Sequence, residues 1–180
     1  MTNDTTGNAP AIDGERADLL EALGTQRHFL RYTTRDLTDE QARQRTTASE
    51  LTLGGLIKHV ANVEKGWADF VEAGPSAMSD FSAMTEADFA RWADQFKLLP
   101  GETLAGVLDD YAKVAQRTDE LVASLPDLNL SHPLPKAPWF PPDATRSARR
   151  VFLHIIAETA QHAGHADIIR ESLDGAKTMG

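Results

Sequence analysis

Residues 147–175, SARRVFLHIIAETAQHAGHADIIRESLDG, predict one long amphipathic helix. At about 100° per residue, one face of this helix carries the apolar residues Val151, Ile155, Ile169 and Leu173. Glu158 and His162 fall in the middle of the same face, and His154 and His165 lie close beside them. A carboxylate and an imidazole are costly to bury unless they are paired, protonated or bound to a metal. The helix therefore predicts a packed core with a polar site inside it.

Three further stretches repeat apolar residues every three or four positions, as amphipathic helices do. They span residues 14–36, 49–73 and 103–125. Gly54 and Gly55, near the start of the second stretch, favour close packing there. No useful alternating β-pattern and no internal repeat accompany these stretches. Four long helices with intervening loops predict an all-α fold, a four-helix bundle, in which side chains on facing helices build polar sites.

Two shorter helices are predicted between the long ones, each opened by a capping pair. Thr38 and Gln41 form the first pair, before a single turn. Thr85 and Asp88 form the second, and the helix that follows them carries the aromatic residues Phe89, Trp92 and Phe96. These elements are predicted as additions to the bundle.

Residues 126–146 contain six of the nine prolines and so predict neither a regular helix nor a central strand. Trp139 and Phe140 lie in this segment, and a mere linker does not need them. Two interpretations stay open. The loop covers one end of the bundle and shapes a pocket, or its aromatic side chains plug the core.

Composition limits the partners of the chain. Its 180 residues predict one domain, placed at residues 13–175 between a frayed segment at 1–12 and a tail at 176–180. A net charge of −9 argues against nucleic acid or an anionic membrane as a partner. No apolar run approaches the roughly 18 residues that span a bilayer, and the first residues do not resemble a signal peptide, so we expect a cytoplasmic protein. The chain has no cysteine, so any thiol chemistry uses an external thiol.

Glu158 and His162 are four residues apart, so their side chains leave adjacent turns in the same direction. Two ligands at this spacing can chelate one ion, and a third must come from another helix. His59, beside the apolar stripe of the second long helix, is the natural candidate. Two histidines and one glutamate leave a coordination position open, which is typical of a catalytic divalent metal. His28 and His132 have no such context and are predicted to be solvated.

Spacing alone leaves other ligand sets open. His162 and His165 are three residues apart, and His154 and Glu158 are four apart, so either pair could also chelate. A histidine on an apolar face is more often a hydrogen-bonded core residue than a ligand, and a glutamate and a histidine four apart more often form a surface pair. A histidine outside the ligand set could orient a ligand or act as a general base.

Two segments, LTLGGLIKHVANVEKGWADF and HIIAETAQHAGHADIIRESLDG, resemble the DinB-like superfamily. More narrowly, they resemble its actinobacterial domain-of-unknown-function branch, which is related to mycothiol-dependent enzymes. The resemblance covers the chain from about Asp13 to Gly175. It implies a four-helix bundle with up-down-down-up topology and a divalent metal held by His59, Glu158 and His162. Many relatives have histidine at the position of Glu158.

The resemblance also implies a function. It is that of a metal-dependent thiol S-transferase in which the metal, zinc or else nickel, iron or manganese, activates mycothiol or another low-molecular-weight thiol toward an electrophile. His165, one turn beyond the last ligand, is the implied catalytic residue, and Trp67 and Trp139, with Phe140, are the expected pocket walls. The alternatives are a metal-dependent hydrolase, a thiol-dependent isomerase, and a non-catalytic stress-response protein stabilised by its metal. A homodimer is expected as a possible assembly.

Overall fold

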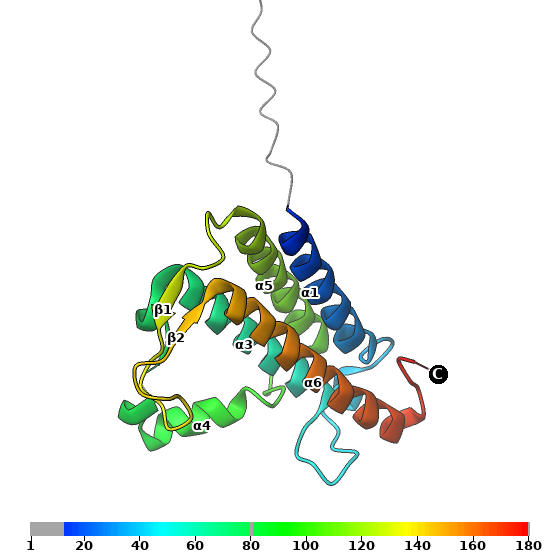
Figure 1. The fold of residues 1–180 in the computed structure, drawn as a ribbon. Coiled ribbons are helices and arrows are strands. Elements are labelled where there is room, and N and C mark those ends of the chain that lie inside the picture. The colour runs from blue at the N-terminus through cyan, green and yellow to red at the C-terminus, as the bar shows by residue number, and fades with distance from the viewer. Residues whose placement is uncertain (1–12, 80, 180) are drawn as a thin grey trace, which may run out of the picture.

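The computed structural model describes residues 13–79 and 81–179, and the predicted frayed segment at 1–12 lies outside these residues. Within the described residues the fold is an all-α bundle, as predicted (Figure 1). Its α-helices are α1 (Gly14–Tyr32), α2 (Asp39–Ala42), α3 (Leu53–Ala73), α4 (Glu86–Asp94), α5 (Leu104–Ser124) and α6 (Ala148–Asp174). Short 3₁₀ helices η1 (Gly74–Ala77) and η2 (Phe81–Ala83) lead from α3 toward α4. Each of the four predicted long helices is present.

Helices α1 and α6 run side by side in the same direction (Figure 1). Glu15 at the start of α1 pairs with Arg149 at the start of α6. At the other end, Arg170 of α6 donates a hydrogen bond of 2.8 Å to the carbonyl oxygen of Thr33, just after α1. The two helices are therefore parallel.

Helices α3 and α5 form a second parallel pair. Lys58 near the start of α3 lies 2.8 Å from Glu102, which lies two residues before the start of α5. Toward the other end, Arg117 of α5 lies 2.5 Å from Asp69 of α3. Helix α6 runs against α3, because the order of the contacts between them is reversed: Trp67 meets His154, whereas the earlier His59 meets the later His162. The topology is thus up-down-down-up.

Side chains cap the helices, and α3 begins at Leu53, four residues after its predicted start at residue 49. The side chains of Thr52, Thr103 and Ser147 cap the first turns of α3, α5 and α6. The two predicted capping boxes are both formed. Helix α3 ends at Gly74, whose φ of 68° favours glycine. Helix α1 ends at Tyr32, four residues before its predicted end.

The proline-rich segment departs from the prediction in one respect. It begins and ends in two short antiparallel strands, β1 (Ser131–Pro133) and β2 (Thr145–Ser147). Three residues per strand are too few to leave an alternating pattern in the sequence. The interpretation that an aromatic side chain plugs the core holds for Phe140, which packs on the core. It does not hold for Trp139, which is 60% exposed.

Two features of α3 depend on close contacts. A Cβ atom added to Gly55 would lie 1.9 Å from the carbonyl oxygen of Phe96, so the chain after α4 packs directly on the first turn of α3. Further along, the fully buried Glu64 accepts hydrogen bonds from Nε and Nη2 of Arg27 in α1, at 3.2 and 2.5 Å. The contact at Gly55 places the segment after α4 against the start of α3, and the pair of Arg27 and Glu64 joins α1 to the middle of α3.

Candidate metal centre and adjoining cavity

His59 is placed by the start of α3 and by the segment after α4. Its side chain is buried, and its ring stacks on Phe96 with 4.2 Å between ring centroids. Burial lowers the pKa of His59, so the imidazole is neutral near pH 7. Nδ1 of His59 is buried and has no hydrogen-bond partner among the described residues. A buried nitrogen without a partner is costly, and a ligand that it could bind would remove that cost.

Glu158 and His162 lie on successive turns of α6, facing α3. Oε2 of Glu158 lies 3.7 Å from Nε2 of His162, and Oε1 lies 3.6 Å from Nε2 of His154. Burial, together with the neighbouring His59 and His165, lowers the pKa of His162 to about 4. Burial, together with the charges of Arg146 and Arg150, lowers the pKa of His154 to about 4 as well. Because these imidazoles are neutral at pH 7, their contacts with Glu158 are not salt bridges.

The three predicted ligands come together. One ligand atom from each of His59, Glu158 and His162 lies within 4.8 Å of the others. Zinc binds such atoms at about 2.0–2.2 Å, so modest side-chain adjustments would bring all three onto one ion. Two neutral imidazoles and a carboxylate are also the donor set that suits a divalent first-row metal. The residues present therefore fit a metal ion.

His165 lies beside this group. Its Nδ1 is 3.4 Å from Nδ1 of His162, and the two rings are tilted with centroids 5.4 Å apart. With Nδ1 of His162 engaged by His165, Nε2 is the nitrogen that faces Glu158. His165 is thus placed to orient His162, as histidine neighbours of metal ligands often do.

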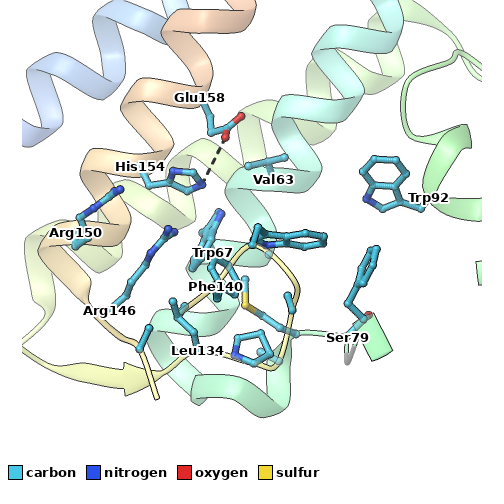
Figure 2. Close-up of a pocket in the computed structure, with 18 of the residues that line it drawn as sticks. Val63, Trp67, Ser79, Trp92, Leu134, Phe140, Arg146, Arg150, His154 and Glu158 are labelled. Carbon is cyan, nitrogen blue, oxygen red and sulfur yellow. Dashed lines mark ion pairs between the residues drawn. The ribbon is translucent and has the colours of Figure 1, made fainter. Parts of the chain in front are cut away.

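A cavity of about 850 Å³ adjoins two of the three residues, and Figure 2 shows Glu158 in its wall. His59 and Glu158 contribute to its wall, and so do Trp67, Trp139 and Phe140, the three predicted wall residues. The ring of Trp67 is buried and meets His154 edge to face, with centroids 5.0 Å apart. Trp139 is on the proline-rich loop and packs edge to face on Phe81. The predicted wall residues therefore lie around one space.

The cavity also contains two arginines that the sequence analysis missed. Arg146 comes from β2, and Arg150 from the first turn of α6 (Figure 2). A signal for one of them was present, because Arg150, His154, Glu158 and His162 recur at intervals of four residues. Arg150 is neither apolar nor a metal ligand, so its place in this repeat does not by itself indicate a site.

The two remaining histidines lie apart from this site. His28 is exposed on α1, as predicted. The prediction for His132 was wrong: its ring is half-buried, contacts Phe70, and has Nε2 3.1 Å from the carbonyl oxygen of Val71. The pairing of β1 with β2 brings His132 over the end of α3, and the short strands could not be read from the sequence.

The fold and the site together define a helical-bundle protein with a two-histidine, one-glutamate group that can hold a divalent cation. The family model of mycothiol-S-transferase matches residues 18–175. The chain belongs to this family, a DinB-like family related to mycothiol enzymes. No curated protein matches it. No helix among the described residues is long and apolar enough to cross a membrane.

Proposed function

We propose that this protein is a metal-dependent S-transferase that joins mycothiol to an electrophilic small molecule. The observation that carries the proposal is the convergence of His59, Glu158 and His162 within 4.8 Å at the wall of a cavity of about 850 Å³. The match to the mycothiol-S-transferase family supplies the thiol. Zinc is the metal that we propose. A cytoplasmic location, a homodimer and a single domain at residues 13–175 stay predictions.

The proposed reaction forms a bond between the thiol sulfur and an electrophilic carbon, breaks the bond from that carbon to its leaving group, and releases the thiol proton. His59, Glu158 and His162 would hold a divalent cation, which would supply the Lewis acidity that makes a thiol ionise near neutral pH. Glu158 would contribute a carboxylate oxygen and His162 a ring nitrogen, and His165 orients His162 through the contact between their Nδ1 atoms. Buried Trp67 excludes water from one side of the cavity.

Elemental analysis tests the metal site. We expect about one equivalent of divalent metal per chain in the purified protein and almost none in His162→Ala. His28→Ala is the matched control, because His28 is exposed and distant from the cluster. A full equivalent of metal in His162→Ala would show that the ligand assignment is wrong.

A thiol-depletion assay tests the reaction. The metal-loaded protein is incubated with an electrophile in the presence and absence of mycothiol, and both reactants are followed. Consumption that needs mycothiol and removes one thiol per electrophile supports the proposal. Equal consumption without thiol would instead identify a metal-dependent hydrolase, in which the cation activates water. Regeneration of the thiol with a rearranged product would identify an isomerase.

A further inference from the structure

Two arginines in the cavity are left without carboxylate partners in a chain of net charge −9. Among the described residues, no carboxylate oxygen lies within 4.0 Å of Arg146 or Arg150. Other arginines of the fold are paired in this way, including Arg27, Arg117 and Arg149. Arg149 is the direct neighbour of Arg150, but it faces α1 and pairs with Glu15. Arg31, Arg35 and Arg43 also lack a carboxylate partner among the described residues, so this absence alone does not set the cavity arginines apart. What sets them apart is that both line one cavity and that Nη1 of Arg146 is buried without a partner in the described part of the chain.

The guanidinium of Arg146 packs against two aromatic rings, but one of its nitrogens lacks a hydrogen-bond partner among the described residues. Its guanidinium carbon lies 4.6 Å from the ring centroid of Trp67 and 5.3 Å from that of Phe140. Its Nη1 is buried and has no hydrogen-bond partner in the described part of the chain. Burial and the nearby charge of Arg150 lower the pKa of Arg146. A buried donor without a partner is costly, so the cost points to an acceptor that is bound in the working protein.

The position of Arg150 does not stabilise helix α6. It is in the first turn of α6, where the helix macrodipole disfavours a cation, and its side chain is exposed. Both arginines line the same cavity as Glu158 (Figure 2). Arg150 is eight residues before Glu158 on α6, which corresponds to about 12 Å along the helix axis. A small molecule can span that distance.

We propose that Arg146 and Arg150 form an anion subsite, which binds a carboxylate or phosphate group on one of the two reactants and directs its reactive end toward Glu158. This inference rests on the proposed transferase function. Guanidinium groups suit such oxyanions because they donate charge-assisted, paired hydrogen bonds. Trp67 and Phe140 keep the guanidinium of Arg146 in position before the reactant arrives. Mycothiol has no carboxylate or phosphate, so the electrophile is the carrier of the anion, and the thiol pair in the assay checks this assignment.

The test uses matched reactants that differ only in charge. The electrophiles are 4-chloro-3-nitrobenzoate and 4-chloro-3-nitrobenzamide; with either, sulfur bonds to the ring carbon, chloride leaves and the thiol proton goes to solvent. The thiols are N-acetylcysteine and its amide, compared with mycothiol. At low ionic strength, where screening is weak, we expect a lower KM for the anionic member of one pair. Arg150→Met should raise that KM about tenfold, the usual effect of losing a charge-assisted hydrogen bond, and leave the KM of the neutral member unchanged.

Arg45→Met is the control variant, because Arg45 forms an exposed pair with Glu50 and is not among the cavity residues. It should change neither KM. Arg146→Met should act like Arg150→Met, and a thermal melt separates this effect from any loss of packing on Trp67. Equal KM values for anionic and neutral reactants in the wild-type protein would overturn the inference.

Calorimetry with 3-nitrobenzoate, which lacks the leaving group, gives a readout without turnover. Binding that is lost in both arginine variants supports the subsite, even if no reactant pair is turned over and the proposed transferase function fails. Binding that survives in both variants but disappears after chelation would place the carboxylate on the metal and overturn the inference. No binding to the wild-type protein would overturn it as well.

Discussion

Gly55→Ala tests whether the segment after α4 controls the metal centre. The added Cβ would lie 1.9 Å from the carbonyl oxygen of Phe96, and ordinary contacts begin at 3.4 Å. The carbonyl must therefore retreat by about 1.5 Å, the difference between these distances. Because the carbonyl belongs to the backbone, no rotamer change relieves the contact. Overpacking of this kind costs about 1–3 kcal/mol. The ring of Phe96 would move with its backbone and lose its stacking on His59.

The assay has two readouts, thermal unfolding and metal content. A loss of about 2 kcal/mol corresponds to a fall in Tm of about 4–8 °C for a chain of this size, and we expect weaker metal binding as well. Gly24→Ala is the matched control: Gly24 is in the interior of α1, is exposed, and has nothing within 4 Å of an added Cβ. There alanine should stabilise the helix by about 1 kcal/mol. The reasoning is refuted if Gly55→Ala unfolds no earlier than the wild type and keeps a full equivalent of metal.

Three further predictions concern the metal, the buried ion pair and the cavity rim. If the free metal concentration had been a thousandfold above its Kd, chelation should remove about 4 kcal/mol of stability and lower Tm by roughly 8–16 °C. Far-ultraviolet circular dichroism should still show a helical protein after chelation. Loss of the helical signal would favour a purely structural role for the metal. Glu64→Gln should cost about 1–3 kcal/mol in urea unfolding, because it removes the buried partner of Arg27 and leaves only the half-exposed Asp119 to pair with it. The double variant Arg27→Met, Glu64→Leu should recover much of this loss, and equal losses in the two variants would argue against the pair. Trp139→Ala should raise the KM of the electrophile a few-fold, because about 1 kcal/mol of aromatic contact is lost. Tm should stay unchanged, because Trp139 is 60% exposed. A large fall in Tm would contradict this prediction.

The helices could be predicted because the apolar pattern of each long helix lies within one continuous stretch of sequence. Apolar spacing and the capping boxes at Thr38 and Thr85 depend only on residues within a few positions of each other. The direction in which the helices run is not local, and here it came from the family resemblance. The contacts between Arg170 and Thr33 and between Lys58 and Glu102 confirm that direction.

Features that depend on distant segments were not visible in the sequence. The pair between Arg27 and Glu64 joins two helices, and neither residue stands out in its own apolar stripe. His132 was predicted to be solvated because it lies outside any apolar helical stripe, yet the strand pairing brings it over the end of α3. Spacing predicted the local pair of Glu158 and His162, but the choice of His59, Glu158 and His162 as the ligand set came from the family resemblance, and the fold brings these three residues together.

The four-residue interval on α6 explains how one helix serves both the cavity and the metal centre. Four residues turn about 400°, so each step drifts about 40° around the helix, and three steps drift about 120°. Arg150, His154 and Glu158 consequently line the cavity, whereas His162 turns away from it toward the ring of His59, with centroids 4.8 Å apart. Glu158 is at the junction, with one carboxylate oxygen toward His154 and the other toward His162. A strict helical repeat would have placed all four side chains on one stripe, where residues that bind the reactant and residues that bind the metal would compete for the same space.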